Sequence, residues 1–503
     1  MPRQVPAIRI QQLNRNPRNP AGEYVLYWMT ASRRLHSNFA LDRAIEHCRE
    51  TKLPLLIFEP LRCDYQWASR RLHSFVIRGM ADNAATAAQN GHIYVPWVEP
   101  RFRAGEGFIE AVAAKAAAVV TDDYPCFFLP QMVRAVARRI GVLLESVDSN
   151  GLLPMRATEQ VFPTAYAFRR YLQKSLTPHL SEFPLENPLA DRSLPRLATT
   201  PAVFSGLWSP ASPELLACQP AALDQLPVDQ TVREGIARGG AVAGTACMVE
   251  FLRRKLSRYG EDRNHPDADG GSGLSPWLHF GHVSVHQIFS AMAAQEGWSQ
   301  SQLGDPKQTR GGRSGWWSMS EAAESFLDEL VTWRELGFNM CSKVRHYDRW
   351  DSLPDWAQQT LNEHAADPRP HLYSLDQLQQ AATHDPVWNA AQRQLLEEGR
   401  MHNYLRMLWG KKVLEWSSRP EDALQVLIEL NNRFAVDGRD PNSYSGIFWV
   451  FGRYDRAWGP ERKIFGKIRY MTSDNTVKKL DMQAYLRKWG SSGAKRRSSD
   501  RAD

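Results

Sequence analysis

Hydrophobic positions in the first third of the chain alternate between short apolar runs and longer stretches of helical periodicity. The runs that predict strands are Tyr24–Met29, Leu53–Leu61, His92–Val98, Ala118–Thr121 and Val142–Val147. The stretches that predict helices lie between them, around Leu41–Cys48, Arg70–Ala88, Phe108–Ala116 and Gln131–Ile140. Short apolar strands that alternate with helices are typical of a parallel sheet covered on both faces. We therefore expect an α/β domain over residues 1–157, with a doubly wound, Rossmann-like parallel sheet.

The alternation is lost in the middle of the chain. Residues 158–233 include the proline-rich stretches Ser181–Pro195 and Pro201–Pro227, which predict an extended linker with little regular structure. Beyond Glu234 apolar residues recur at spacings of three and four, as in Phe326, Leu330 and Trp333, which predicts helices. The expected continuation is an all-α domain over residues 234–489.

Two stretches stand apart from this helical pattern. Gly304–Ser318 is rich in Gly, Ser and Arg, which predicts a mobile loop. Residues 490–503 are polar and basic, which predicts a disordered tail.

Charge and cysteine content say little about the binding partners of the protein, but they argue against a zinc site and a disulfide framework. The 503 residues carry 62 Lys and Arg against 55 Asp and Glu, a net charge of +7. This bias is compatible with a polyanionic partner, and equally with a basic protein that has none. The six cysteines form no CxxC pair, so neither a zinc site nor a disulfide framework is indicated.

The same composition indicates where the protein works. Its cysteine usage fits a reducing cytosol. The chain has no apolar signal core and no run of about 18 apolar residues that could cross a bilayer. We therefore expect a cytoplasmic protein, nucleoid-associated if bacterial, that does not insert into a membrane.

A glycine-rich segment, Tyr259–Phe280, has the composition of a phosphate-binding turn. Gly270, Gly271 and Gly273 surround Ser272, and Ser275 begins the next predicted helix. Small residues let the backbone approach a phosphate, and a helix N-terminus supplies N–H donors. On these residues alone, a flexible turn is the commoner explanation.

The helix predicted over Glu324–Leu336 combines a carboxylate with an indole. Glu329 and Trp333 stand four residues apart and so share a face. In a base pocket, such a ring stacks on the base while the acid bonds its polar edge. A core tryptophan beside a solvated glutamate explains the same pair.

A third segment, Thr383–Trp416, is rich in tryptophan, as is the chain, which has 17 in all. Trp409 and Trp416 are two helical turns apart on one face, and Trp388 precedes them near the end of an adjacent helix. Indoles spaced in this way can pass a single electron. They are also ordinary helix-packing core.

Two further segments carry polar and basic residues. Leu430–Trp449 contains Asp437-Gly438-Arg439-Asp440-Pro441-Asn442, a turn by its chemistry. Tyr454–Tyr470 interleaves aromatic and basic residues, and its Lys463, Lys467 and Arg469 can contact phosphates. A solvated basic face is nearly as good an explanation for any one of these three.

Taken together, these segments resemble the photolyase and cryptochrome family. The pattern of THDPxWNAAQ, MHxYLRM and WxKKxLEW within Thr383–Trp416 resembles class II cyclobutane pyrimidine dimer photolyases in particular. The resemblance covers nearly all of Val242–Tyr470, and Tyr27–Leu41 resembles the class II opening, with Ser-Arg-Arg where Ser-Gln-Arg is usual. The connector 196–230 and the loop 304–318 depart from the family pattern.

The resemblance implies roles for named residues. FAD would be bound by Tyr259, Ser272, Gly273, Leu274, Ser275, Asn403, Arg406, Asn431, Asp437 and Arg439. Arg406 would pair with Asp437, Asn431 would lie near the flavin N5, and desolvation would raise the pKa of Glu329 so that it donates to pyrimidine carbonyls. The dimer would be bound by Glu329, Trp333, Met407 and Trp449, and its DNA by Lys463 and Arg469.

The implied activity is light-driven repair of cyclobutane pyrimidine dimers in double-stranded DNA. Glu329, Asn431 and Met407 would be the catalytic residues around fully reduced, anionic FAD, with no metal. Electrons for photoreduction would pass along Trp409 and Trp388, with Tyr373 as a candidate outer donor. Trp416 is a weaker candidate for this path, and a structural role explains it as well. An antenna chromophore, either a deazaflavin or a folate, is left open, and a monomer is expected.

Three alternatives share part of this pattern. A cryptochrome-like light sensor would have the same fold and FAD without repair. An enzyme for the (6-4) photoproduct would need histidine acid–base residues in its pocket. A non-catalytic DNA- or RNA-binding protein would use the tryptophans only structurally, and would bind no flavin.

Overall fold

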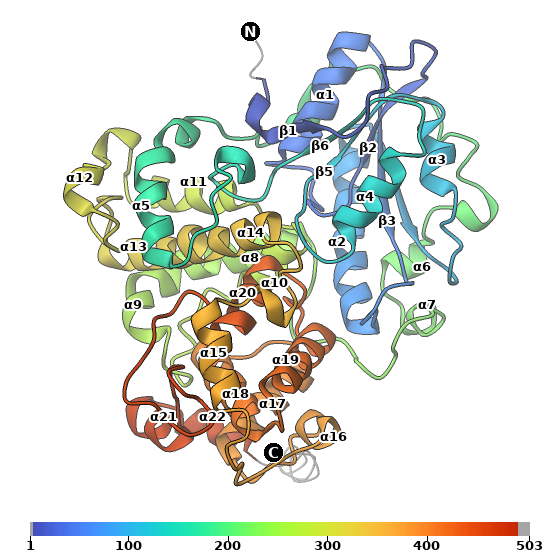
Figure 1. Ribbon diagram of the computed structural model, residues 1–503. Coiled ribbons are helices and arrows are strands. Elements are labelled where there is room, and N and C mark those ends of the chain that lie inside the picture. The colour runs from blue at the N-terminus through green and yellow to red at the C-terminus, as the bar shows by residue number, and fades with distance from the viewer. Residues whose placement is uncertain (1–3, 491–503) are drawn as a thin grey trace, which may run out of the picture. The chain divides into compact units, whose positions relative to one another are not determined.

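The computed structural model describes residues 4–490, which form two compact units that interleave along the chain (Figure 1). Unit 1 comprises the described residues up to Gln160, together with Leu172–Val249 and Leu274–Leu303. Unit 2 comprises Val161–Tyr171, Glu250–Gly273 and the described residues from Gly304 onward. The division at residues 157, 233 and 489 therefore stays a prediction, and residues 491–503 of the expected tail lie outside the described residues.

Unit 1 contains a six-stranded sheet with the order β1-β6-β5-β2-β3-β4. The strands are β1 (Ile10–Gln12), β2 (Tyr24–Trp28), β3 (Leu55–Leu61), β4 (Ile93–Val98), β5 (Ala116–Asp122) and β6 (Leu144–Val147). The neighbours from β6 to β4 are parallel, as the sequence predicts, and only β1 runs antiparallel, with Ile10 opposite Val147. The prediction missed β1 because two of its three residues, Gln11 and Gln12, are polar and exposed.

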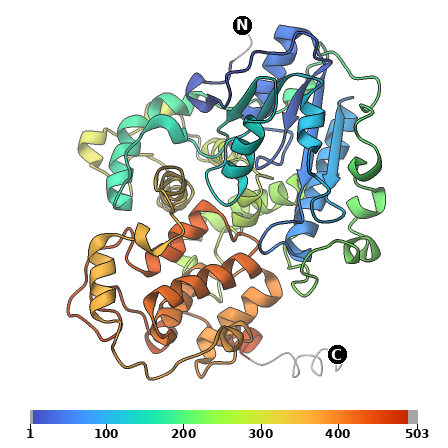
Figure 2. The ribbon, with the colours of Figure 1, turned by 45° about the vertical axis from the view of Figure 1, so that its right-hand side comes forward.

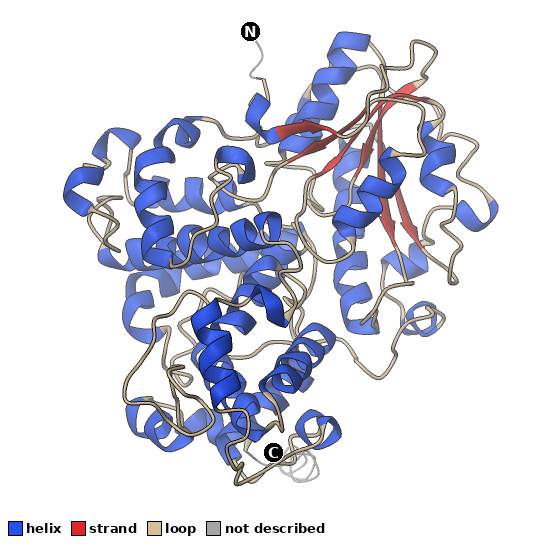
Figure 3. Ribbon diagram, viewed as in Figure 1, coloured by secondary structure: helices blue, strands red, loops and turns tan. Residues whose placement is uncertain are grey.

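Helices cover both faces of this sheet, which confirms the predicted α/β class (Figures 2 and 3). Successive strand residues point to opposite faces. On β2, Leu26 packs in the core that contains residues of α3 (Phe108–Ala113) and α4 (Leu129–Ala137). Its neighbour Val25 packs in the opposite core, with α1 (Phe39–Thr51). The expected helix over Phe108–Ala116 is shorter because β5 already begins at Ala116.

The residues that follow β2 are held by a buried carboxylate on β5. Asp122 accepts hydrogen bonds from the backbone N–H groups of Thr30, Ala31 and Ser32, at 2.7, 2.8 and 3.1 Å, and from the Tyr27 hydroxyl at 2.8 Å. The segment that resembles the class II opening is therefore an ordered turn at the carboxyl edge of the sheet.

The stretch expected to be an extended connector contains more helix than the sequence predicted. It includes α5 (Ala165–Ser175), α6 (Pro213–Leu216), α7 (Pro220–Asp224) and several 3-10 turns. In α5 the buried Phe168 and Leu172 are four residues apart, so they share a face. The surrounding prolines concealed this helical spacing, and several of them stand in the first turn of a helix, where proline is favoured.

Unit 2 is helical, and none of its described residues belongs to a strand of the sheet. Its longer helices are α13 (Glu321–Leu327), α14 (Arg334–Lys343), α15 (Asp355–Glu363), α17 (Pro386–Glu398), α18 (Asn403–Trp416), α19 (Pro420–Phe434) and α20 (Pro441–Val450). Helix α18 packs against α17, α19 and α20, and is therefore central to the unit. The predicted all-α character is confirmed. The expected loop 304–318 contains the single turn α12 (Pro306–Thr309).

The described part of the chain also bears on metals, disulfides and membranes. All six cysteines are free thiols. Residues 4–490 contain no group of three or more His, Cys, Asp or Glu side chains placed to hold a metal ion. None of the helices among these residues has both the length and the hydropathy that crossing a bilayer requires.

Candidate functional site

Four aromatic side chains of unit 2 form a continuous series. The rings of Trp409 and Trp388 are stacked, with centroids 6.3 Å apart and planes 8° from parallel. Trp388 in turn meets Trp416 at 5.6 Å, and Trp416 meets Tyr373 at 5.3 Å, both edge to face. The structure therefore brings together the three predicted electron-transfer residues, and Trp416, the weaker candidate, lies between Trp388 and Tyr373.

Local structure holds the two inner indoles. The Trp409 indole N–H donates to Gln392 Oε1 at 2.9 Å, and the Trp388 indole N–H donates to the Trp409 carbonyl at 3.1 Å. Asp385 caps α17 by accepting from the backbone N–H groups of Val387 and Trp388, each at 3.0 Å. Thus the THDPxW motif is a helix start that fixes the position of Trp388.

A charged pair lies one helical turn before Trp409. Arg406 on α18 donates to Asp437 at 3.0 Å, so the structure brings together the two residues that the resemblance implied would pair. Both side chains are partly accessible. Asn403 is exposed in the first turn of α18, and Met407 is half-buried beside Arg406.

Asn431, near the end of α19, is buried and held rigidly. Its amide donates to Ser443 Oγ at 2.7 Å and to Asn432 Oδ1 at 3.2 Å. The same Asn432 oxygen accepts from the backbone N–H of Arg439 at 2.9 Å, which fixes the turn after α19. Arg439 is itself buried, with a positive φ of 65°.

The carboxylate and indole of the second segment lie on a π-helical turn, η9 (Asp328–Trp333), between α13 and α14. Such turns interrupt α-helices with one extra residue and are frequent at functional sites. Glu329 is half-buried and accepts a hydrogen bond from Arg263. Burial alone would lower the pKa of Arg263, but the Glu329 carboxylate raises it overall. The guanidinium also lies 5.5 Å from the ring of Tyr259.

The two tryptophans expected to enclose a dimer are both half-buried. Trp333 ends η9, and α14 continues directly from it to pack against α20, which contains Trp449. Gly337 permits this packing, because a Cβ there would lie 2.9 Å from the Asn442 Cα. The two rings are therefore presented by neighbouring helices of one unit.

A fully buried lysine lies beneath Trp449. The Lys411 ammonium is 4.7 Å from the indole ring and donates to the Val450 carbonyl at 2.6 Å. Burial lowers the pKa of Lys411 to about 7, although Asp455 opposes this shift. Arg469 pairs with Asp455 at 2.7 Å and lies 5.8 Å from the Trp449 ring.

The remaining candidate residues are two lysines on the surface and the residues of the glycine-rich segment. Lys463 is exposed, and Lys467 is exposed and paired with Glu461 at 3.1 Å. Tyr259 is buried on α9 (Tyr259–Asp262), and Ser272 and Gly273 also belong to unit 2, whereas Leu274 and Ser275 belong to unit 1. Ser275 does begin a helix, α10 (Ser275–His279), but that helix has only five residues.

Sequence reasoning missed three groups that contact the candidate residues. Arg263 pairs with a glutamate 66 positions away, which no local spacing reveals. Lys411 looks like part of a solvated basic face in the string GKKVLEW, and only packing shows that it is buried. His384 bonds the hydroxyl group of Tyr373, and of these two residues the sequence indicates only Tyr373 as a candidate.

The polar groups near Trp409 suit a flat ring with polar edges, such as the flavin that the resemblance implies. The Asp437 carboxylate could accept from an imide N–H, and the partly accessible Arg406 guanidinium could donate to a ring carbonyl. Asn431 adds an amide of fixed orientation. Of these groups, Arg406 lies on α18 one helical turn before Trp409, and its partner Asp437 and the amide of Asn431 belong to the same unit.

Comparison with known proteins identifies the family. A family model described as DNA photolyase matches residues 25–188. The deoxyribodipyrimidine photo-lyase of Methanothermobacter thermautotrophicus is 34% identical over 484 residues, which are 95% of this chain and 97% of that protein. That of Potorous tridactylus is 33% identical over 479 residues, covering 92% of this chain and 80% of that one.

A solved structure agrees with this at the level of the fold. The crystal structure of a bacterial class III photolyase from Agrobacterium tumefaciens superposes with a TM-score of 0.64 and 16% identity, covering 93% of this chain and 86% of that one. Together with sequence identity of 33 to 34% along most of both chains, this shows that the chain belongs to the DNA photolyase family, a family of lyases.

Proposed function

We propose that the protein repairs cyclobutane pyrimidine dimers in double-stranded DNA under light, as a class II photolyase. The observation that carries the proposal is the aromatic series Trp409–Trp388–Trp416–Tyr373 in unit 2, which begins one helical turn from Arg406 and Asp437. Family membership supports DNA photorepair, and the motif in Thr383–Trp416 supports class II.

FAD is the cofactor that these residues would hold. Arg406, Asp437 and Asn431 would bind the edge of its ring system, with Asn403 and Arg439 beside them. Tyr259, Ser272 and Gly273 of the same unit would contact the rest of the cofactor. When bound in its reduced form, FAD would supply the light-excited electron that opens the cyclobutane ring.

The dimer would be held by aromatic surfaces and one charged pair. Trp333 and Trp449 would stack against the flipped-out bases. The flexible side chain of Met407 would pack against the dimer and fill the space beside it. Glu329 would hydrogen-bond the pyrimidine edge. Its partner Arg263 would balance the negative charge that an added electron places on the dimer.

The direct test is repair of a defined thymine dimer by the purified, flavin-loaded protein. The flavin is first reduced chemically, and repair is followed by chromatography of the oligonucleotide under blue light and in the dark. We expect light-dependent repair. Flavin binding without repair of this substrate would overturn the proposal in favour of a light sensor, and repair of a (6-4) photoproduct alone would identify the other repair activity.

Replacement of Trp409 by Phe separates electron supply from repair. Because Trp409 begins the series, Trp409→Phe should abolish photoreduction of the oxidised flavin while repair by chemically reduced protein stays near wild type. Trp489→Phe removes a buried indole of the same unit that lies outside the series, and is the matched control. Photoreduction that survives in Trp409→Phe at the wild-type rate would contradict the assignment.

The remaining parts of the proposal concern the protein as a whole. The chain would act as a monomer, in the cytoplasm or on the nucleoid, on DNA that contains pyrimidine dimers. A second chromophore, a deazaflavin or a folate, would be recognised by chromatography of the pigments that acid releases from purified protein.

A further inference from the structure

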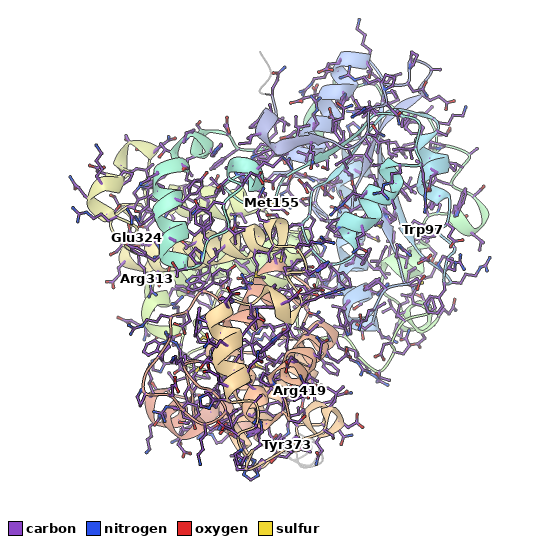
Figure 4. The ribbon with its side chains drawn as sticks, in the orientation of Figure 1. Trp97, Met155, Arg313, Glu324, Tyr373 and Arg419 are labelled. Atoms are coloured by element: carbon purple, nitrogen blue, oxygen red, sulfur yellow. The ribbon has the colours of Figure 1, made fainter. Side chains whose placement is uncertain are left out.

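The surface end of the aromatic series has a feature that electron transfer alone does not need. The Tyr373 hydroxyl oxygen lies 2.6 Å from Nδ1 of His384, within hydrogen-bond distance, and it accepts from the backbone N–H of the same residue at 3.0 Å. The tautomer with the proton on Nε2 leaves Nδ1 as the acceptor of the hydroxyl proton. His384 is exposed, and it stacks on the exposed His371 with ring centroids 3.9 Å apart. Figure 4 shows Tyr373 at the periphery of the helical unit.

We propose that Tyr373 and His384 form a proton-coupled electron donor, in which oxidation of Tyr373 moves its hydroxyl proton to His384 Nδ1. The inference rests on the proposed function, because it requires that an excited flavin draw an electron from Trp409. The inference adds a base, His384, to the electron-transfer path. The proton can leave through this exposed residue, which is not part of the aromatic series.

The step balances as one electron and one proton. Trp409 would give an electron to a light-excited oxidised flavin, and the resulting hole would move through Trp388 to Trp416. Tyr373 then gives one electron to the Trp416 radical cation. Its O–H bond breaks, an N–H bond forms on His384, and the products are neutral Trp416, a neutral tyrosyl radical and an imidazolium. A thiolate in solution later returns the missing electron, and the proton moves back from His384 to Tyr373.

The hydrogen bonds of the inner indoles explain why the proton would be lost from Tyr373 and not from Trp409 or Trp388. The Trp409 indole N–H is bonded to the side-chain amide oxygen of Gln392, and that of Trp388 to a backbone carbonyl. Amide oxygens are very weak bases, so neither indole has a ready proton acceptor. Tyr373, in contrast, bonds an imidazole nitrogen, which is a much stronger base than an amide oxygen.

Electrostatics favour the same end point. The Lys412 ammonium lies 5.6 Å from the Trp416 ring, and it disfavours a positive charge on that indole. Its ion pair with Glu415, at 2.8 Å, reduces this effect without removing it. The tyrosyl radical itself is neutral, and the positive charge moves to the exposed imidazole, where solvent screens the repulsion from Lys412 better than at the buried indole.

The groups around His384 leave it able to accept the proton. Partial burial, and then the neighbouring His371, lower the pKa of His384, and Lys412 acts in the same direction. Asp385 and Glu415 oppose the shift without cancelling it. The imidazole is therefore neutral at pH 7. Acidification below the pKa of His384 should protonate it and slow formation of the tyrosyl radical.

The competing explanation is that the hydrogen bond between Tyr373 and His384 only stabilises the fold. The hydrogen bond joins Tyr373, which precedes α16 (Leu375–Gln379), to the residue before the Asp385 cap of α17. In that case, loss of His384 would lower thermal stability and leave the radical chemistry unchanged. The two explanations are separated by measuring the radical itself.

The test uses flavin-loaded protein, a blue laser flash, and time-resolved optical and electron paramagnetic resonance spectroscopy. We expect a tyrosyl radical in the wild type, formed more slowly in D2O than in H2O, and none in Tyr373→Phe. His384→Asn keeps a polar side chain but removes the base, and should slow formation of the radical about a hundredfold. His371→Asn, which removes the stacked ring but not the acceptor, is the matched control and should retain fast formation.

Two further measurements separate the role of His384 as a proton acceptor from the proposed repair function. Titration of His384 by NMR in the flavin-free protein should give a pKa that changes in Tyr373→Phe. Repair by chemically reduced protein should be unchanged in His384→Asn, so failure of this inference is distinct from failure of the proposed function. Radical formation at the wild-type rate in His384→Asn, or its absence in a wild type that still photoreduces its flavin, would overturn the inference.

Discussion

At the residue scale, Lys411 is the most unusual charged group near the candidate site. It has no exposed surface, and its partners are the Val450 carbonyl and the face of Trp449. A buried ammonium with so few partners is costly, and the cost falls when the group releases its proton. The position of Trp449 is therefore coupled to a base that titrates near neutral pH.

This coupling predicts a specific dependence of stability on pH. Between the folded pKa of Lys411, about 7, and its unfolded value of 10.5, the unfolded chain holds a proton that the folded protein has released. The free energy of unfolding should therefore rise with pH in this window, by up to about 1.4 kcal/mol per pH unit from this group. Lys411→Met, which keeps the volume without the charge, should lack that contribution.

The measurement is urea unfolding of wild type and variant at several pH values. The free energy of unfolding of Lys411→Met should exceed that of the wild type by less and less as the pH rises toward 10.5, because only the wild type gains stability from the titration. Lys412→Met removes the adjacent ammonium, which is paired with Glu415, and serves as the control. Parallel pH curves for wild type and Lys411→Met would show that Lys411 does not titrate in this window.

At the scale of elements, helix starts and packed helices position the aromatic series. Trp388 lies in the first turn of α17, and Trp409 lies on α18, which packs against α17. The Asp385 cap satisfies two N–H groups at the start of α17, and Asp385 also accepts from Ser473. The end of this helix nearest the stacked pair therefore depends on one carboxylate.

We expect Asp385→Ala to lower the free energy of unfolding by about 1 to 2 kcal/mol, the usual cost of losing a helix cap. Asp385→Asn retains an oxygen acceptor at the cap and should lose much less. Chemical denaturation followed by far-ultraviolet circular dichroism measures both. Equal destabilisation by the two substitutions would show that the charge, and not the cap, is what stabilises α17.

The sequence predicts these elements better than it predicts their contacts. Every strand from Tyr24 to Val147 was placed within two residues at each end, because buried parallel strands are continuous apolar runs. Seven-residue spacing placed Trp409 and Trp416 on one helix. That Trp388 lies between them in space depends on how α17 packs on α18, which no periodicity encodes.

At the scale of the whole molecule, the net charge of +7 is small for a protein proposed to bind DNA. Specific placement of charge must therefore matter more than its total. Arg469 is paired with Asp455, whereas Lys463 is exposed on the same segment. Of these two, Lys463 is the one whose contact with a phosphate would require no existing ion pair to break.

Binding of dimer-containing DNA should weaken as salt increases, and Lys463→Ala should reduce the slope of log K against log salt by about one unit. Lys115→Ala, on the sheet-containing unit and paired with Glu23, is the control and should leave the slope unchanged. Fluorescence anisotropy over a series of salt concentrations measures both. An unchanged slope in Lys463→Ala would remove this residue from the DNA contact surface.

The interleaving of the two units has a consequence for synthesis on the ribosome. Unit 1 includes Leu274–Leu303, so its last packed segment emerges only after more than half of the chain has been made. Val161–Tyr171 emerges early but belongs to unit 2, and must wait for the residues beyond Gly304 before its own partners exist. A chain cut between the sheet and the helices would thus yield two incomplete fragments, so the protein is expected to mature late and as a whole.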